Sequence, residues 1–158
     1  MKLHLLRHAK TDQRSSTGKD IDRKLLAKGK NQSLEMGKYF SVLGFDPSII
    51  LCSSSVRTRE TMDQVQKVHL FKSEVIYLEN LYLCEKEELL LILCSQINSK
   101  DVFIIGHNNG LSDFASYLTD DFIDLKTCDF VTIDFEIDTW QEASKGLGKV
   151  TNRFHPLV

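Results

Sequence analysis

Three short segments of the chain carry side chains that could bind and transfer a phosphoryl group. The first ends in Arg7 and His8, the second is Ser53–Arg57 (SSSVR), and the third is Gly106–Gly110 (GHNNG). The planar guanidinium of arginine matches phosphate oxygens with paired hydrogen bonds. A neutral imidazole can act as a nucleophile or carry a proton near pH 7. The side chains that would share a cationic pocket are Arg7, His8, Arg57 and His107.

Each of these segments lies at the end of a predicted strand. Apolar runs predict strands over Lys2–Arg7, Ser48–Ser53, Glu74–Leu78 and Asp101–Ile105. In open α/β sheets, ligands bind at the carboxyl ends of the strands. Each turn also leads into a predicted helix, whose first N–H groups favour an anion. The sequence therefore predicts that the two arginines and two histidines meet at one edge of a sheet, with a phosphate-like anion as ligand.

Helical periodicity separates these strands. The expected helices cover Lys28–Leu43, a stripe of Thr58, Met62, Val65 and His69, then Glu85–Ile97, and a stripe from Leu111 to Leu118. Crossover helices force parallel pairing of the strands that they connect. Phe130–Ile137 and Gly146–His155 are expected to form a closing hairpin. The predicted fold is a three-layer α/β/α sandwich with a mostly parallel central sheet, formed as a single domain over residues 1–158.

Composition excludes several classes of protein and partner. Of the 158 residues, 42% are hydrophobic and 27% charged, with a formal charge of −2, which is typical of soluble domains and favours neither nucleic acid nor an anionic membrane as partner. The first ten residues (MKLHLLRHAK) are too interrupted by charge for a signal peptide. No apolar run reaches membrane-spanning length. We therefore expect a cytoplasmic protein without a membrane partner.

Two other uses of these residues are disfavoured by their spacing. His4 and His8 are four apart, which on a strand separates them by roughly 13 Å, and neighbouring arginines repel a cation, so no metal site is expected. Cys52 precedes Arg57 in a serine-rich turn, as in cysteine-dependent phosphatases. That turn has four intervening residues where those enzymes need five, and it has no glycine. Cys52 is therefore predicted to be a buried strand residue, and the four cysteines to be reduced and structural.

Several motifs, in the same order along the chain, resemble the histidine phosphatase superfamily, which includes the phosphoglycerate mutases. The short length and the RHAK sequence are most similar to its SixA-type phosphohistidine phosphatases. The similarity covers essentially the whole chain. It lies in Leu5–Lys10 (LLRHAK), Asp20–Leu25 (DIDRKL) before Gly29, Ser53–Thr61 (SSSVRTRET), Glu79–Tyr82 (ENLY), Gly106–Asn108 (GHN), Trp140 and Pro156.

The resemblance implies a phosphoglycerate mutase-like fold and a cofactor-independent phosphohydrolase. His8 matches the nucleophile that forms a phosphohistidine intermediate, and Arg7, Arg57 and His107 match the phosphate-binding residues. The chain departs from the family pattern in having Ser53–Ser55 (SSS) for the usual SPA, and Asn109 for the proline after GHN. Neither departure removes a charged group.

The proton donor for the leaving group is left open by the resemblance. In larger relatives a glutamate after the third strand has this role, and Glu79 is the candidate here. Asn80 could align there instead, SixA-type members may do without the acid, and Glu79 could simply be an exposed surface residue. Asp20 and Arg23 could line the mouth of the site or belong to a solvated loop.

The spacing of the motifs limits the class of substrate that we expect. Residues 58–106, forty-nine in all, are already occupied by two helices and a strand, so no lid insertion is expected. A shallow pocket suits a phosphate displayed on a protein, such as phosphohistidine on a phosphotransfer domain. A small phosphoester as substrate, or a non-catalytic module that binds phosphohistidine, are the alternatives.

Overall fold

One six-stranded sheet forms the centre of the protein. The structure is a computed structural model that describes residues 1–158, and its strands lie in the order β3-β2-β4-β1-β5-β6. Pairing is parallel from β3 through β1, whereas β5 runs antiparallel to β1 and to β6. The sheet is mostly parallel, as predicted. The strand bounds are β1 (Lys2–Arg7), β2 (Ile49–Ser53), β3 (Val75–Leu78), β4 (Asp101–Gly106), β5 (Phe130–Phe135) and β6 (Gly148–Phe154).

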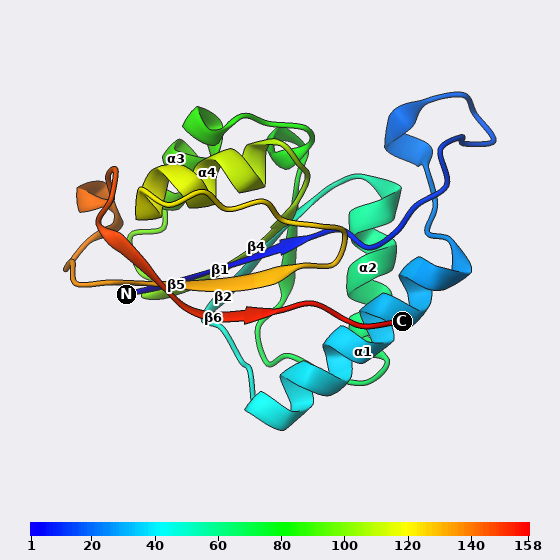
Figure 1. The fold of residues 1–158 in the computed structure, drawn as a ribbon, viewed down its shortest axis with the longest axis horizontal. Coiled ribbons are helices and arrows are strands. Elements are labelled where there is room, and N and C mark those ends of the chain that lie inside the picture. The colour runs from blue at the N-terminus through cyan, green and yellow to red at the C-terminus, as the bar shows by residue number, and fades with distance from the viewer.

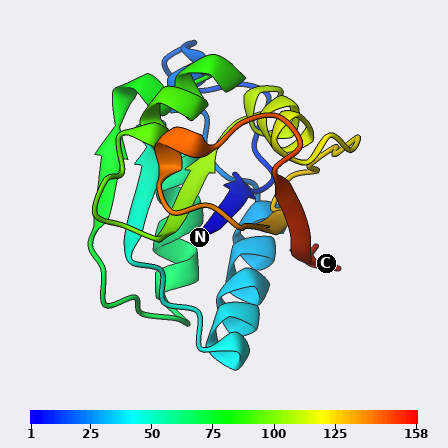
Figure 2. The ribbon, with the colours of Figure 1, turned by 90° about the vertical axis from the view of Figure 1, so that its left-hand side faces the viewer.

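Two pairs of helices cover the two faces of this sheet. α1 (Ala27–Leu43) and α2 (Val56–Gln66) lie on one face, and α3 (Lys86–Cys94) and α4 (Gly110–Thr119) lie on the other (Figures 1 and 2). This arrangement confirms the predicted three-layer α/β/α fold. None of the helices combines the length and the apolarity that crossing a membrane requires.

The alternation of side chains along the strands produces two cores. On β1, Leu3 and Leu5 pack toward α3 and α4, while Leu6 packs toward α1 and α2. Each of these leucines is fully buried. Burying a leucine side chain contributes about 1.5–3 kcal/mol, so the two cores hold the strands and their carboxyl ends in fixed positions. The helix residues facing them include Leu93 and Phe114 in one core, and Phe40 and Met62 in the other.

Several predicted elements are longer than the observed ones. α2 ends at Gln66, so His69 lies outside the helix whose stripe it was expected to join. α3 ends at Cys94, and Ile97 beyond it is 79% exposed. The polar run that follows (SQINSK) favours turns over helix, which explains the early end. β5 likewise ends at Phe135, before Ile137.

The segment between α2 and β4 contains no added helical layer. It forms β3, a 3₁₀ turn over Glu79–Leu81, and α3. Both β3 and α3 are part of the sheet and its cover, so nothing from this segment is left over to form a lid. The expected absence of a lid insertion therefore agrees with the observed order of elements.

Candidate active site

The carboxyl ends of three adjacent strands surround one pocket. β2, β4 and β1 are neighbours in the sheet, so the residues that follow them meet at one edge. The pocket has a volume of about 290 Å³. All four residues predicted from the sequence line it. Its lining consists of Arg7, His8, Lys10, Thr11, Gln13, Asp20, Arg23, Arg57, Leu83, His107, Asn108 and Thr127.

The segment that leaves β1 is held on both sides. The backbone N–H of His8 donates to the carbonyl of Gly106 at 3.1 Å, which ties the segment to the end of β4. On the other side, the N–H of Cys128 donates to the carbonyl of His8 at 3.1 Å. The Arg7 side chain donates through Nη1 to the carbonyl of Leu125 at 2.8 Å. These bonds fix Arg7 and His8 relative to the other strands.

α1 supports the same segment from below. The N–H of Lys10 donates to the side-chain oxygen of buried Gln32 at 3.0 Å, and the carbonyl of Lys10 accepts from Leu26 at 3.0 Å. A Cβ on Gly29 would lie 2.0 Å from that same carbonyl oxygen. Only glycine allows the first turn of α1 to approach the backbone so closely. The helix therefore sets the position of the chain just after His8.

The imidazole of His8 has a defined tautomer. Nδ1 lies 2.8 Å from the carbonyl oxygen of Ala9, and because a carbonyl only accepts, Nδ1 carries the hydrogen. Nε2 then has the free lone pair. Burial, together with the nearby guanidiniums of Arg57 and Arg7, lowers the pKa of His8 to about 3. At neutral pH the ring is uncharged, as a nucleophilic imidazole must be.

His107 approaches His8 from the end of β4. The two ring centres are 5.3 Å apart. Nε2 of His107 lies 2.7 Å from the hydroxyl oxygen of Ser53, so the hydrogen bond at one end of the ring orients the other end, Nδ1. Burial and the charge of Arg57 lower the pKa of His107 to about 2. His107 is therefore a second neutral imidazole in the pocket.

Arg57 enters the pocket from the first turn of α2. Ser55 caps this helix by accepting a hydrogen bond from the N–H of Thr58, which fixes where the helix begins. The Arg57 side chain is only 2% exposed. Its Nη1 donates to the carbonyl of Asp20 at 2.8 Å and its Nη2 donates to Asp20 Oδ2 at 2.9 Å. A buried guanidinium with these partners is held in one orientation.

Three buried polar atoms without a hydrogen-bond partner belong to this pocket. They are Nε of Arg7, Nε of Arg57 and Nδ1 of His107, and no other fully buried side-chain nitrogen or oxygen lacks a partner. Leaving a buried donor unsatisfied costs about 1–3 kcal/mol, so such atoms need an explanation. Two cationic donors and an imidazole on one pocket match an anion with several acceptor oxygens, as a phosphoryl group has.

A loop carboxylate, that of Asp20, lies at the mouth of the pocket. Asp20 lies in a 3₁₀ turn and accepts from Arg57, from Arg23 Nη1 at 2.9 Å and from the hydroxyl of Tyr82 at 2.6 Å. Although burial opposes the effect, the hydrogen bonds from Tyr82, Arg23 and Arg57 lower the pKa of Asp20 well below its usual range. Asp20 and Arg23 therefore line the site, which decides between the two interpretations that the sequence had left open.

Glu79 lies outside the pocket. It begins the 3₁₀ turn after β3, is exposed, and is not one of the lining residues. Its neighbour Asn80 donates to Glu88 on α3 at 2.8 Å and is also exposed. The structure thus brings together Arg7, His8, Arg57 and His107, and does not bring Glu79 to them.

Sequence reasoning missed residues that act on the predicted ones. Ser53 orients His107, and Tyr82 both donates to Asp20 and packs its ring edge-on against His107 at 5.5 Å. Ser53 ends β2, so its place at the carboxyl edge was a usable signal. Tyr82 reaches the site through the turn after β3, and the Glu79–Tyr82 (ENLY) motif was the signal that marked this turn.

The rival uses of these residues do not fit the geometry. Cys52 is a fully buried β2 residue, and burial raises the pKa of its thiol, which keeps it protonated. Both ring nitrogens of His4 are engaged elsewhere, by Thr132 at 2.9 Å and by Asp101 at 2.7 Å. No group of three or more histidine, cysteine or acidic side chains lies in an arrangement that could hold a metal ion.

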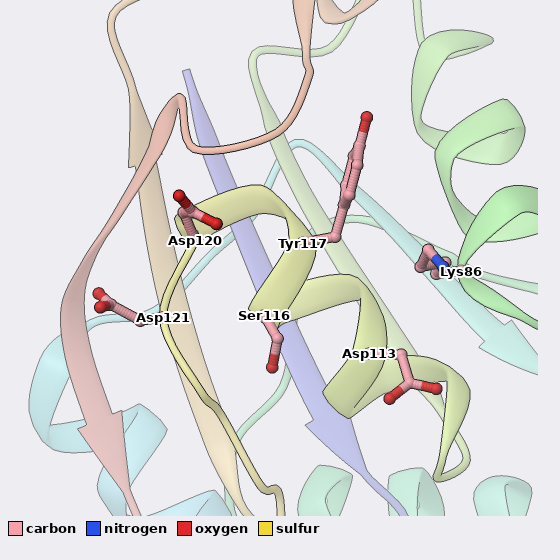
Figure 3. Close-up of a pocket in the computed structure, with 6 residues that line it drawn as sticks. All are labelled: Lys86, Asp113, Ser116, Tyr117, Asp120 and Asp121. Carbon is pink, nitrogen blue, oxygen red and sulfur yellow. The ribbon is translucent and has the colours of Figure 1, made fainter.

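A second hollow, of about 430 Å³, lies along α4 and is larger than this pocket. It is open to solvent and its side chains point outward from the helix surface (Figure 3). Three carboxylates and one lysine among its polar groups disfavour an anion there, because like charges repel. The hollow therefore does not suit a phosphate, although it is larger than the pocket at the strand ends. The hollow is lined by Lys86, Asp113, Ser116, Tyr117, Asp120 and Asp121.

The sequence is similar to a known family and to a curated protein. The family model of the histidine phosphatase superfamily (branch 1) matches residues 3–82. An uncharacterised chloroplast protein of Arabidopsis thaliana is 31% identical over 152 residues, which cover 90% of this chain and 70% of the relative.

Solved structures with the same fold include SixA proteins. A candidate phosphohistidine phosphatase SixA from Agrobacterium tumefaciens has a TM-score of 0.84 at 19% identity, covering 98% of this chain and 97% of that one. The protein histidine phosphatase SixA complexed with tungstate has a TM-score of 0.82 at 17% identity, with coverage of 98% and 97%. A phosphoserine phosphatase from Entamoeba histolytica, in complex with 3-phosphoglyceric acid, has a TM-score of 0.65 at 16% identity, with coverage of 96% and 95%.

Proposed function

Because the chain belongs to the histidine phosphatase superfamily (branch 1), and is thus a phosphatase, we propose that it hydrolyses phosphohistidine in proteins through an intermediate on His8. The observation that carries this proposal is the hydrogen bond from His8 Nδ1 to the carbonyl of Ala9. It leaves Nε2 with its lone pair, in a pocket where Arg7, Arg57 and His107 each have an unpartnered buried nitrogen.

In the first step, the lone pair of His8 Nε2 forms a bond to phosphorus while the bond from phosphorus to the leaving nitrogen breaks. The electron pair of that bond returns to the leaving imidazole. Arg7 and Arg57 donate hydrogen bonds to the equatorial oxygens, where charge is spread in the transition state. The His8 ring, still carrying its Nδ1 hydrogen, becomes a positively charged phosphoimidazole. The Ala9 carbonyl stabilises that charge by accepting from Nδ1.

In the second step, water attacks phosphorus and the bond from phosphorus to Nε2 breaks. The electron pair returns to Nε2, and both hydrogens of the water leave with the phosphate. His8 is restored as the neutral tautomer with which it began. This sequence uses only groups of the chain and one water molecule.

The leaving group favours phosphohistidine over an alkyl phosphoester. Imidazole has a pKa of about 6.5, so the ring of phosphohistidine can bring its own proton and leave as a neutral molecule. An alkoxide needs a general acid. Asp20 is the carboxyl group that lines this pocket, and its lowered pKa keeps it ionised. If a small phosphoester were the substrate, Glu79 would be the candidate acid, and it lies exposed outside the lining.

The partner we propose is a phosphotransfer domain or another protein that displays phosphohistidine. The chain between Arg57 and His107 forms no lid, so a phosphorylated side chain can reach the pocket from the surface of a folded protein. We propose the cytoplasm as the location of this reaction.

A trapped intermediate tests the mechanism. The protein is mixed briefly with a ³²P-labelled phosphohistidine protein, quenched, denatured and separated from substrate. We expect a base-stable, acid-labile adduct on the wild-type chain and none on His8→Asn. His69→Asn is the matched control, because His69 lies beyond α2 and bonds Phe45 and Ser41, away from the pocket. Full turnover by His8→Asn would contradict the proposed mechanism.

A substrate panel tests the specificity. Phosphate release is compared for the phosphohistidine protein, phosphoserine and sugar phosphates at equal concentration. We expect kcat/KM to be highest for phosphohistidine, because that leaving group needs no acid from the chain. A higher kcat/KM for the phosphoesters would instead favour a small-molecule phosphatase.

A further inference from the structure

Asp20 lines the pocket, but the two proposed steps of phosphoryl transfer give it no role. Its side chain is 42% exposed, so burial does not oblige it to find partners. Yet donors from three separate segments converge on its carboxylate. Oδ2 accepts from Arg57 Nη2 at 2.9 Å and from the Tyr82 hydroxyl at 2.6 Å, and Oδ1 accepts from Arg23 Nη1 at 2.9 Å.

The contacts of Asp20 determine how Arg57 can meet a phosphoryl group. Asp20 takes both terminal nitrogens of Arg57, one through its backbone carbonyl and one through its carboxylate. The third nitrogen, Nε, is buried and unpartnered. Because a guanidinium is planar and rigid, fixing its two terminal nitrogens fixes the direction of Nε. Asp20 thus engages one N–H on each terminal nitrogen of Arg57 and leaves the N–H of Nε as a buried donor without a partner.

The charge of Asp20 also affects the net charge of the pocket. Three guanidiniums, those of Arg7, Arg23 and Arg57, line it together with this one carboxylate. The excess is two positive charges, which a phosphate dianion would neutralise. Lys10 also lines the pocket and adds a further positive charge at its exposed rim. Without Asp20, the pocket would hold a cationic excess even with phosphate bound.

We propose that Asp20 is a positioning residue that aims Arg57 at the phosphoryl group and, through its charge, weakens the binding of product phosphate so that phosphate can leave. The carboxylate and a bound phosphate share the same guanidinium, and each lowers the attraction that Arg57 has for the other. The inference rests on the proposed use of this pocket for phosphoryl transfer.

The test measures phosphate binding and turnover separately. The dissociation constant of inorganic phosphate is measured by calorimetry, and kcat is measured with a phosphohistidine peptide. In Asp20→Asn we expect phosphate to bind about tenfold more tightly, because a negative charge near the bound anion is gone. We expect kcat to fall, because product leaves more slowly and Arg57 loses one charged partner.

A second variant separates the orientation of Arg57 from the effect of the Asp20 charge. Asp20→Ser also removes the charge, but its short side chain no longer reaches as an amide oxygen can. Phosphate binding should tighten in Asp20→Ser as in Asp20→Asn, whereas kcat should fall further in Asp20→Ser. A thermal melt verifies that both variants are folded at the assay temperature.

Asp22→Asn is the matched control. Asp22 belongs to the same 3₁₀ turn and loses the same charge, but it accepts from Thr17 and does not line the pocket. Its phosphate affinity and kcat should equal those of the wild type. Phosphate binding in Asp20→Asn that is unchanged or weaker would overturn the proposal. Failure of the mechanism would show separately, as turnover in His8→Asn, and would leave the phosphate titration interpretable.

Discussion

At the scale of single residues, each side chain of the site is held by a hydrogen bond at one end, and that bond fixes the direction of the other end. His8 is held by Ala9, His107 by Ser53 and Arg57 by Asp20, each through a hydrogen bond of 2.7–2.9 Å. In each case the bond occupies one end of the group and leaves the other end toward the pocket. Such support is what converts a cluster of polar residues into a defined binding geometry.

The neutral histidines have a consequence for stability. In the folded chain the pKa of His8 is about 3 and that of His107 about 2, because burial and nearby arginines disfavour the charged rings. An unfolded histidine has a pKa of about 6.5. Between roughly pH 6.5 and 3 the unfolded chain therefore binds protons that the folded chain does not. The free energy of unfolding must fall as the pH is lowered through this range.

Replacing one of these histidines should reduce that dependence. We expect His107→Asn to lose about 2 kcal/mol less stability than the wild type between pH 7 and pH 5, because one proton-binding site of the unfolded chain is gone. Urea unfolding at both pH values, in a buffer free of phosphate, measures the difference. The comparison cancels the carboxylates, which titrate in both proteins. Equal losses in the two proteins would show that His107 is not buried in its neutral form.

The residues named from the sequence were those with strong chemical types at strand ends. Arg7, His8, Arg57 and His107 could be placed together because the carboxyl ends of parallel strands share an edge. Asp20 could not be placed, because its position depends on the path of a polar loop that has no apolar periodicity. The roles of the four residues, and that of Glu79, stay predictions until the variants are measured.

At the scale of elements, α1 supports the strand end that carries His8. Its first turn lies against Lys10, two residues beyond His8, and the close approach requires Gly29. The sequence predicted this helix over Lys28–Leu43, within one residue of its observed start at Ala27. Periodicity predicts which face of a helix is buried, but it does not say which backbone the helix end will touch. That contact follows only from the packed structure.

Gly29→Ala tests this support. The added Cβ would lie 2.0 Å from the Lys10 carbonyl oxygen, so either the helix or the segment after His8 must move. We expect a loss of about 1–3 kcal/mol in stability, as for other overpacked sites, and a fall in kcat of the folded protein. Chemical unfolding and phosphate release, normalised to folded protein, measure the two effects.

The matched control is Gly37→Ala in the same helix. Its Cβ would lie 2.7 Å from the carbonyl oxygen of Val65 on α2, far along the helix from Lys10. This variant should also be less stable, but its kcat should match that of the wild type. If the two variants lose activity equally, the effect of Gly29 is general destabilisation and not displacement of the strand end.

At the scale of the whole molecule, the architecture was predictable and its exceptions were local. Four strand–helix alternations predicted the parallel part of the sheet, and the last two strands were correctly assigned to a hairpin. The errors occurred at the ends of elements, as at His69 and Ile97, where turn chemistry overrides periodicity. All six strands belong to one sheet. The single domain over residues 1–158 stays a prediction.

The absence of a lid predicts how the enzyme responds to the size of its substrate. The pocket is about 290 Å³, enough for a phosphoryl group and an adjoining ring, and its mouth is formed by the Asp20 turn and by Leu83, which is 50% exposed. A site that closes over its substrate rejects a phosphate attached to a folded protein. An open site does not, since only the phosphorylated side chain must enter.

We therefore expect kcat/KM for a folded phosphotransfer domain bearing phosphohistidine to lie within about tenfold of that for an unstructured phosphohistidine peptide, a difference of about 1.4 kcal/mol. Phosphate release measured at matched concentrations gives both values, and His8→Asn provides the background for each. A folded substrate that is cleaved hundreds of times more slowly than the peptide would mean that the mouth is restrictive. In that case the turn around Asp20 would act as a barrier to proteins, and small phosphorylated molecules would become the better substrate class.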